Sequence, residues 1–412
     1  MVRLPPRLRP LFPYLKPAYT AATRAVAPLS VKLATMRATG LPTGSVATVE
    51  EAAAATGGRC VLARPAEPIV RKPPRPGSAD RVFAEQLVET APRTVVAELP
   101  GGRLLGPHHA VIDGNGDLVY ELSYYFGTTR PREHPLFLHP FPPAPLHVQG
   151  RLGVLATRGD ANYYHFLMDV LPRLATLAAC PEIEPPERWY VPAATRFQRE
   201  LLDRVGITEE RRIDSSVVPH VRAETLIVPT PPAMTVVNPP WVVSHLRATL
   251  LDPPIERVDD RAIYVTRGGS ANNRAVRNED AVMAALAARG FEFVDPGAMS
   301  VAEQIRCFAE ATVIVAPHGA ALANLVFASA GATVVELFPA GSVVPDYWKL
   351  SGGVPGLDYR YLTGVGRRQS GTRSQMLVSD IEVDLPALES VLDDVSSPRT
   401  ENPSTPPSAT GR

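Results

Sequence analysis

The chain has 412 residues, long enough for two domains that each bury a core of their own. Its hydrophobic content of 45%, its charged content of 20% and its net charge of zero are ordinary for a globular protein, and they exclude a nucleic-acid-binding class based on overall charge. Its 3 cysteines are too dispersed for a disulfide framework or a structural zinc site, which indicates a reducing, cytoplasmic compartment.

Residues 1–75 lack clear periodicity, and we expect them to form an irregular, basic N-terminal arm. Residues 1–40 contain seven Lys or Arg side chains, whereas the first acidic residue is Glu50. Two interpretations stay open for this arm, a solvated leader or a segment that rests on anionic lipid at the inner face of the plasma membrane. The sequence contains no run of about 18 apolar residues, so no transmembrane helix is predicted.

Short β-strands are expected from residue 94 onward, so some antiparallel β-structure is predicted near 93–125. The run Asp-Gly-Asn-Gly-Asp at 113–117 joins two of these strands. A calcium-binding loop would need Gly at its sixth position and Glu at its twelfth, and both are missing here. A hairpin turn is therefore the preferred interpretation.

Apolar residues recur at helical spacing across 163–174, and Asn162 is placed to cap the start of that helix. His165 and Asp169 are four residues apart, so they share one face. They are the best acid–base candidates: His165 can accept a proton while Asp169 orients the ring, or the roles can be reversed. A purely structural role for His165 is the third interpretation.

A Pro-rich connector at 251–260 separates the second half of the chain, where strands and helices alternate as in a parallel sheet. The expected elements are strands at 261–266, 291–294, 312–316 and 333–337, and helices at 278–289, 300–310 and 385–395. Asn278 and Ser300 are the expected caps of the first two helices. Residues 396–412 are rich in Ser, Pro and Thr and are expected to be disordered.

The loop after the first of these strands contains Arg267 and Arg274, separated by Gly and polar residues. It follows the carboxyl end of a parallel strand, where ligands bind in such sheets. Two guanidinium groups there can hold a diphosphate, since they bind phosphate oxygens in pairs and stay charged. A pair of solvated arginines is the alternative.

The most informative segment is Pro-His-Gly-Ala-Ala-Leu-Ala-Asn at 317–324, which lies between two apolar strands. Strand, small-residue turn and helix in this order place unpaired backbone N–H groups where an anion can bind, near His318, Gly319 and Ala320. An ordinary βα turn is the alternative. Glu336, near the end of the next strand, is expected either to accept hydrogen bonds from ribose hydroxyls or to be a surface carboxylate.

Several motifs are missing. The sequence contains neither a Walker loop nor Gly-x-Gly-x-x-Gly, so kinase, ATPase and standard dehydrogenase functions lack support. It also lacks Asp-x-Asp, the usual metal clamp for a sugar diphosphate, so arginines and a helix dipole would have to neutralise a leaving group.

Three ordered blocks of sequence across about residues 150–340 resemble glycosyltransferase family 61. The matching residues are Asn162-Tyr163-Tyr164-His165-Phe166 with Asp169 and Leu171-Pro172-Arg173, then Tyr264-Val265-Thr266-Arg267 with Arg274, and finally the run from His318 to Asn324 with Phe327, Gly331 and Glu336. The chain departs from the family pattern at Phe166, where Trp is frequent, and at Ala321, where Gly is frequent.

The resemblance implies an α/β fold of the GT-B type, with two Rossmann-like domains facing a cleft. It implies residues 76–250 as the acceptor-side domain, 251–260 as a hinge, and 261–384 as the nucleotide-sugar-binding domain. Donor contacts are implied for Arg267, Arg274, His318, Gly319, Ala320, Asn324 and Glu336. Acceptor-side contacts are implied for Asn162, Tyr164 and Arg173, and catalysis for His165 or Asp169.

The activity implied is inverting transfer of a sugar from a nucleotide-sugar to a hydroxyl of a glycan or lipid-linked glycan, with no obligatory metal and no other cofactor. The high content of Ala, Arg and Pro suggests a GC-rich bacterial genome and a role in surface-polysaccharide synthesis. A pyruvyl-type transferase of capsule synthesis and a non-catalytic nucleotide- or glycan-binding module are the alternatives.

Overall fold

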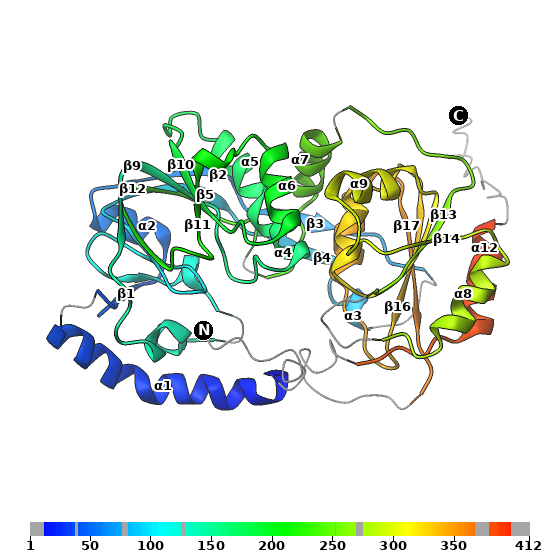
Figure 1. The fold of residues 1–412 in the computed structure, drawn as a ribbon, viewed down its shortest axis with the longest axis horizontal. Helices are drawn as coiled ribbons and strands as arrows, with labels where there is room; N and C mark the ends of the chain where they lie inside the picture. The colour runs from blue at the N-terminus through cyan, green and yellow to red at the C-terminus, as the bar shows by residue number, and fades with distance from the viewer. Residues whose placement is uncertain are drawn as a thin grey trace, which may run out of the picture.

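The computed structural model describes residues 12–37, 40–75, 81–125, 128–233, 235–251, 253–268, 275–366 and 379–396 (Figure 1). Two large β-sheets, one in each half of the chain, organise these residues, and helices pack on both of them. The expected mixed α/β class with parallel strands is confirmed. No helix among the described residues has the length and apolarity needed to cross a membrane.

The sheet of the N-terminal half has ten strands and is mixed. Its strands are β1 (Ser45–Val46), β2 (Arg59–Arg64), β5 (Thr94–Pro100), β6 (Arg103–Leu105), β7 (Ala110–Ile112), β8 (Leu118–Val119), β9 (Leu146–Val154), β10 (Arg188–Val191), β11 (Arg212–Asp214) and β12 (His220–Pro229). Strands β12, β9, β10 and β11 are parallel neighbours, as in a Rossmann-like unit. Strands β5 and β6 each pair antiparallel with β12, and β6 pairs antiparallel with β7, which confirms the antiparallel structure expected near 93–125.

Helices and short turns of this half surround the sheet. They are α1 (Phe12–Arg37), α2 (Val49–Ala55), η2 (Glu121–Ser123), η3 (Pro131–Glu133), η4 (Pro135–Leu138), α4 (Tyr163–His165), η5 (Phe166–Val170), α5 (Pro172–Ala178), α6 (Arg196–Arg204), η6 (Glu209–Arg211) and α7 (Pro240–Leu250). The turn at 113–117 is a hairpin turn, as expected, in which Oδ1 of Asp113 accepts from the amides of Asn115 and Asp117.

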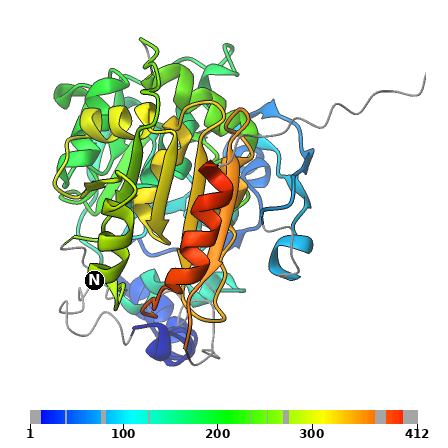
Figure 2. The same ribbon diagram turned by 90° about the vertical axis from the view of Figure 1, so that its right-hand side faces the viewer.

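The sheet of the C-terminal half is entirely parallel, with the strand order β14-β13-β15-β16-β17. Its strands are β13 (Ala262–Val265), β14 (Glu292–Val294), β15 (Val313–Pro317), β16 (Thr333–Phe338) and β17 (Asp358–Thr363), and its helices are α8 (Glu279–Ala287), α9 (Val301–Glu310), η7 (Ala320–Phe327), α10 (Asp346–Ser351) and α12 (Leu385–Ser396). Figure 2 shows α12 and α8 on the outer face of this sheet.

Two local predictions for this half need correction. Asn278 precedes α8 but makes no capping bond. Its side-chain amide instead exchanges two hydrogen bonds with the backbone of Val383, which ties α8 to the chain before α12. The helix expected after the 317–319 turn is a 3₁₀-helix, η7. The capping box of Ser300 and Glu303 is confirmed.

The prediction of an irregular arm over residues 1–75 is wrong for most of its described residues. Helix α1 continues through Pro17 and Pro28, and it is followed by α2 and by β2, which pairs with β5. Proline normally disfavours a helix interior, but here packing against η3 and η4 stabilises the helix. Residues 1–11 of the arm and the tail at 397–412 lie outside the described residues.

A segment of the N-terminal half packs on the C-terminal half, so the domain boundaries predicted from sequence are crossed. It comprises the strand pair β3 (Glu67–Val70) and β4 (Val88–Ala91) with α3 (Arg81–Ala84) between them (Figure 1). The ring of Phe83 contacts Trp348, with 5.1 Å between ring centres, and the indole N–H of Trp348 donates to the carbonyl of Lys72 at 3.0 Å. The Lys349 ammonium pairs with Glu89 at 2.7 Å.

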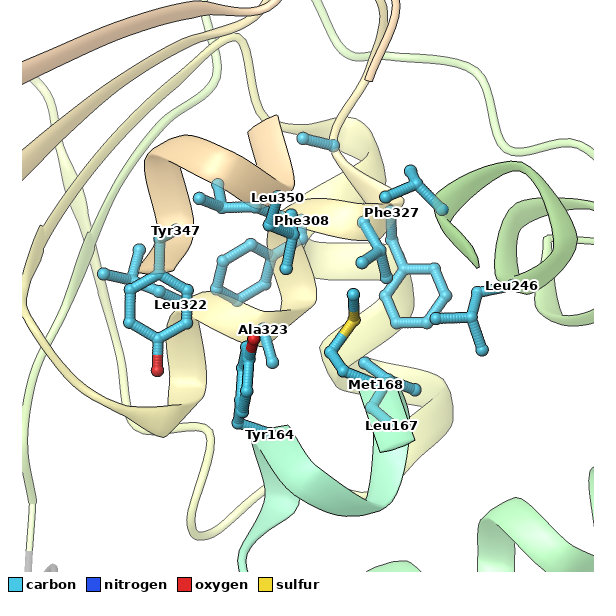
Figure 3. Packing of buried hydrophobic residues seen from close by; sticks show 14 of the residues in the cluster. Tyr164, Leu167, Met168, Leu246, Phe308, Leu322, Ala323, Phe327, Tyr347 and Leu350 are labelled. Carbon is cyan, nitrogen blue, oxygen red and sulfur yellow. The ribbon is translucent and has the colours of Figure 1, made fainter. Parts of the chain in front are cut away.

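One hydrophobic cluster joins the two halves. Figure 3 shows Tyr164, Leu167 and Met168 of the N-terminal half packed against η7, α9 and α10. Separating the halves would expose this cluster to water, at roughly 25 cal/mol per Å² of apolar surface. We infer that the connector at 251–260 does not act as a hinge for wide opening of the halves.

Candidate functional site

The C-terminal sheet has a topological switch point between β13 and β15. Numbered along the chain, its strand order is 2-1-3-4-5, in which the direction of winding reverses between the first and third strands. Ligands in such sheets bind outside the carboxyl ends of the strands at this point. Arg267 follows β13, and His318 and Gly319 directly follow β15. The structure therefore brings these predicted donor-binding loops together at the expected edge.

Arg267 and the 317–319 turn are in direct contact. Nη1 of Arg267 donates a hydrogen bond to the backbone oxygen of His318 at 2.9 Å. A Cβ atom at Gly319 would lie 2.9 Å from the same nitrogen, so the glycine lets the guanidinium approach the turn. Burial lowers the pKa of Arg267, but a guanidinium remains charged at neutral pH. Arg274, the second expected diphosphate ligand, lies outside the described residues.

The turn offers fewer backbone donors than the sequence predicted. The amide of His318 donates to the carbonyl of Leu337 at 2.9 Å and is part of the sheet. Gly319 and Ala320 stand at the start of η7, where backbone N–H groups have no acceptor within the helix. The predicted anion contact therefore falls to Gly319 and Ala320, beside the Arg267 guanidinium.

The side chain of His318 is held by a buried carboxylate. Its Nδ1 lies 2.5 Å from Oε1 of Glu336, and Oε2 of Glu336 accepts from the hydroxyl of Tyr359 at 2.5 Å. Glu336 therefore fixes the orientation of the His318 ring. The imidazole also stacks on Phe338 and contacts Tyr347, with ring centres 5.2 Å apart in both cases.

Two predicted donor contacts are corrected by burial. Glu336 is 0% exposed and both of its oxygens are hydrogen-bonded, so it positions His318 and does not meet a ribose. Asn324 is also 0% exposed. Its Oδ1 accepts from the Tyr163 hydroxyl at 2.7 Å, and its amide donates to Gln304 at 3.0 Å. Asn324 therefore links the two halves of the chain.

His165 and Asp169 form the pair expected from their spacing. Nδ1 of His165 lies 2.7 Å from Oδ2 of Asp169, and both side chains are partly exposed. The chain between them is a π-helix, η5, which closes with a bond from the amide of Leu171 to the carbonyl of Phe166 at 3.1 Å. Single-turn π-helices are frequent at functional sites.

Gly159 makes room for the His165 ring. It adopts φ +79°, and a Cβ atom there would lie 3.0 Å from Cδ2 of His165. The two constraints, a left-handed backbone and a close ring, both require glycine at this position. Gly159 belongs to the loop after β9, so this loop at the carboxyl end of a parallel strand positions His165 from the other side.

Two cations lie next to this pair. Arg158 precedes Gly159, lies 4.7 Å from the ring centre of Tyr124, and interacts electrostatically with Asp169. Lys16 of α1 lies 5.8 Å from the ring centre of Tyr125, and burial together with the charge of Arg158 lowers the pKa of Lys16. Arg158, like Arg267, follows the carboxyl end of a parallel strand, so the same sequence argument could have predicted it as a site residue. No local sequence signal predicts that Lys16 lies here.

The three predicted acceptor-side residues have structural roles. Oδ1 of Asn162 caps α4 by accepting from the amide of Tyr164 at 2.9 Å, as expected. Tyr164 is buried, and its hydroxyl donates to Oδ1 of Asn238 at 2.7 Å. Arg173 is buried and donates to the carbonyls of Pro229 and Ala156. Of the three, only Asn162 is exposed.

Aromatic side chains connect the two groups of candidate residues across the shared core. The ring of Tyr164 contacts Tyr347 edge to face, with 5.7 Å between ring centres (Figure 3). Tyr347 in turn contacts His318. Tyr164 also lies beside His165. Tyr347 and Tyr359 were missed from the sequence, because single aromatic residues in α10 and β17 carry no motif. No group of three or more His, Cys, Asp or Glu side chains that could hold a metal ion occurs in the described ranges.

The fold and this site define an α/β protein with a ligand-binding edge on a parallel sheet. Residues 163–335 match the family model Glycosyltransferase 61. This match confirms, for residues 163–335, the resemblance to glycosyltransferase family 61 that the sequence motifs indicated.

Curated relatives include protein O-linked-mannose beta-1,4-N-acetylglucosaminyltransferase 2 from Homo sapiens and Canis lupus familiaris. Both are 34% identical over 106 residues, which is 24% of this chain and 18% of theirs. The protein of the same name from Xenopus tropicalis is 32% identical over 116 residues, or 26% and 20% of the two chains. The match therefore spans about a fifth of the length of these relatives.

Proposed function

We propose that the chain is an inverting glycosyltransferase that moves a sugar from a nucleotide-sugar to a hydroxyl of a glycan or lipid-linked glycan. The observation that carries this proposal is the meeting of Arg267 with the His318–Gly319 turn at the switch point of the parallel sheet. The family match over residues 163–335 and the names of the relatives support the reaction class. The two halves would serve as donor and acceptor sides, as in a GT-B arrangement.

His165 is the better of the two candidate bases. Its Nδ1 is hydrogen-bonded to Asp169, so a neutral ring with its proton on Nδ1 presents Nε2 as the basic nitrogen. Asp169 would then orient the ring and stabilise the imidazolium that forms. Arg158 and Arg173 are close enough to Asp169 to interact with it electrostatically.

The transfer would proceed in one displacement at the anomeric carbon. The acceptor oxygen forms the new bond to this carbon as its proton passes to Nε2 of His165. The bond from the anomeric carbon to the diphosphate oxygen breaks, and the diphosphate leaves with the electron pair. Arg267 and the amides of Gly319 and Ala320 would stabilise the charge on this leaving group, without an obligatory metal.

The composition of the chain also supports a proposal for its role in the cell. The relatives are animal proteins whose name describes transfer to O-linked mannose. The Ala-, Arg- and Pro-rich composition of this chain favours a bacterial source. We therefore place the activity in surface-polysaccharide synthesis, in the cytoplasm at the inner face of the plasma membrane.

The testing experiment is calorimetric titration with UDP, GDP, CMP and dTDP in the presence of EDTA. We expect one nucleotide to bind, and Arg267→Ala to weaken its binding by about 1.5–3 kcal/mol, the scale of a charge-assisted hydrogen bond. Arg277→Ala is the matched control, because Arg277 is exposed and pairs with Asp380 away from the turn. No binding to any of the four nucleotides would favour the pyruvyl-transferase or binding-module alternatives.

A further inference from the structure

Helix α1 carries its large apolar side chains on its exposed face. The fully buried side chains that face the protein are small, namely Thr23, Ala27, Ser30 and Ala34, and the partly buried Val31 packs beside them. The exposed ones are Leu15 (53%), Val26 (41%), Leu29 (59%) and Met36 (75%). With 3.6 residues per turn these four positions fall on one side of the helix, and we call them the outer stripe. A helix that packs only on its own protein would have the opposite distribution.

The charge around the outer stripe has one sign. The chain contains no acidic residue before Glu50, and the described part of α1 includes Lys16, Arg24 and Lys32. Arg24 pairs with Glu133 of η3, which fixes the helix on the protein. Lys32 is exposed, close to the outer stripe. A surface whose apolar side chains are flanked by the exposed Lys32, on a helix without acidic residues, is complementary to anionic lipid.

The position of α1 leaves the outer stripe accessible. The helix lies along one edge of the molecule in two perpendicular views (Figures 1 and 2). We propose that α1 lies in the interface of a membrane that contains anionic lipids, with the outer stripe inserted among the acyl chains and Lys32 at the headgroups. Apolar insertion and charge attraction together give the two signals that stable peripheral binding needs.

This orientation has a consequence for the site, which rests on the proposed function. Figure 1 shows the start of α1 below the junction of the two halves. Lys16 in this part of the helix is close enough to Arg158 to feel its charge, and Arg158 is close to Asp169. A membrane-bound chain would hold the His165–Asp169 pair near the lipid surface. An acceptor glycan with a lipid anchor would then reach the base while its anchor stays in the bilayer.

The experiment is flotation of the full chain with vesicles of phosphatidylcholine alone and of phosphatidylcholine mixed with phosphatidylglycerol. We expect binding to the anionic vesicles only. The double variant Leu29→Ser, Met36→Ser should bind them roughly tenfold more weakly, because two apolar side chains no longer insert. Val70→Ser, Val217→Ser is the matched control, since both side chains are exposed outside α1, and its binding should be unchanged.

A second variant tests the electrostatic part without altering the outer stripe. Lys32→Glu should weaken binding to anionic vesicles by at least roughly fivefold, given the usual contribution of one basic residue near such a surface. Failure of the wild-type chain to bind anionic vesicles would overturn the proposal. So would a dimer in analytical ultracentrifugation that the Leu29→Ser, Met36→Ser variant dissociates, since a second copy would then cover the stripe. Neither readout depends on sugar transfer, so this proposal can fail while the proposed function stands.

Discussion

Glu336 holds the imidazole of His318 at the edge of the C-terminal sheet, with 2.5 Å between Oε1 and Nδ1. The two residues come from neighbouring parallel strands, because His318 follows β15 and Glu336 lies in β16. The hydrogen bond to this buried carboxylate fixes the orientation of the imidazole ring. Glu336 thus shapes, through His318, the turn that Arg267 contacts, where the proposed diphosphate would bind.

Replacement of Glu336 by Gln should weaken nucleotide binding. Gln offers one acceptor oxygen where Glu336 offers two, so either His318 or Tyr359 loses its acceptor. We expect nucleotide affinity to fall roughly tenfold and the free energy of unfolding to fall by about 1–3 kcal/mol, the cost of leaving a buried polar group unpaired. Calorimetry and urea denaturation measure the two effects. Tyr359→Phe is the control, and it should reduce stability while leaving affinity nearly unchanged; equal loss of affinity in both variants would contradict this role of Glu336.

Substitution of Gly319 by Ala should displace Arg267. The added Cβ would lie 2.9 Å from Nη1 of Arg267, so the guanidinium must move away from the turn. Nucleotide affinity should fall toward the level of Arg267→Ala, by about 1–3 kcal/mol. In the control variant Gly352→Ala the nearest atom is 3.5 Å away, an ordinary contact. Full affinity in Gly319→Ala would show that Arg267 does not need this close approach to the turn.

The C-terminal sheet and its ligand edge could be predicted from sequence because their signals are local. The alternation of apolar strands with capped helices predicts a parallel sheet. Because Arg267 and His318 follow the carboxyl ends of two of its strands, their place at one edge of the sheet could be predicted too. The pairing of His165 with Asp169 followed from helical spacing alone. In each case the residues that matter are close in sequence or lie at equivalent ends of neighbouring strands.

Residues whose roles depend on distant contacts could not be predicted. The sequence alone allows Glu336 to be a surface carboxylate. The structure shows that β17 pairs with β16 and that Tyr359 of β17 donates a hydrogen bond to Glu336. The sequence likewise suggests that Asn324 contacts a ligand. In the structure its Oδ1 instead accepts from Tyr163, which is far away in the sequence. Helix α1 was missed because Pro17 and Pro28 interrupt its sequence and its fully buried residues are small, so no apolar face toward a core could be recognised.

His165 should be needed for transfer and not for donor binding. His165→Asn and Asp169→Asn are expected to reduce turnover, by roughly a hundredfold or more for the base, because they remove the proton acceptor or its orienting partner. Radiolabelled sugar transfer measures turnover, and calorimetry with the nucleotide checks donor binding. Unchanged turnover in both variants would show that the base lies elsewhere.

The fit of Gly159 to the His165 ring can be tested against a matched glycine. Gly159→Ala strains a backbone at φ +79° and places a Cβ 3.0 Å from the ring, whereas Gly206→Ala strains a backbone at φ +76° with no atom within 4 Å. Both variants should lose about 1 kcal/mol or more of stability. Only Gly159→Ala should also lose turnover beyond this effect. Equal turnover of the two variants, compared at the same fraction of folded protein, would show that Gly159 does not position His165 for catalysis.

Tyr163 and Asn324 should couple the two halves in unfolding. Their hydrogen bond joins α4 to η7 across the shared core. Tyr163→Phe leaves Asn324 buried with one donor fewer, so we expect a loss of about 1–2 kcal/mol from the free energy of unfolding. Urea denaturation followed by tryptophan fluorescence and by circular dichroism should give coincident single transitions, since the halves share one core. Two separated transitions in the wild-type chain would contradict the coupling.

Acid should destabilise the fold through His134. Burial, with a smaller contribution from the nearby His108, lowers the pKa of His134 from 6.5 to about 3. The unfolded chain therefore takes up a proton that the folded chain refuses, so this stability is fully present above about pH 6.5 and is lost as the pH falls toward about 3. Each pH unit below 6.5 should cost about 1.4 kcal/mol. Nδ1 of His134 also accepts from the amide of Leu136 at 3.1 Å, a bond that protonation would break.

His134→Asn keeps an acceptor without titrating, so urea denaturation between about pH 4 and 7 should show a shallower loss of stability in this variant. Parallel pH profiles for variant and wild type would show that His134 is not the group whose protonation destabilises the fold.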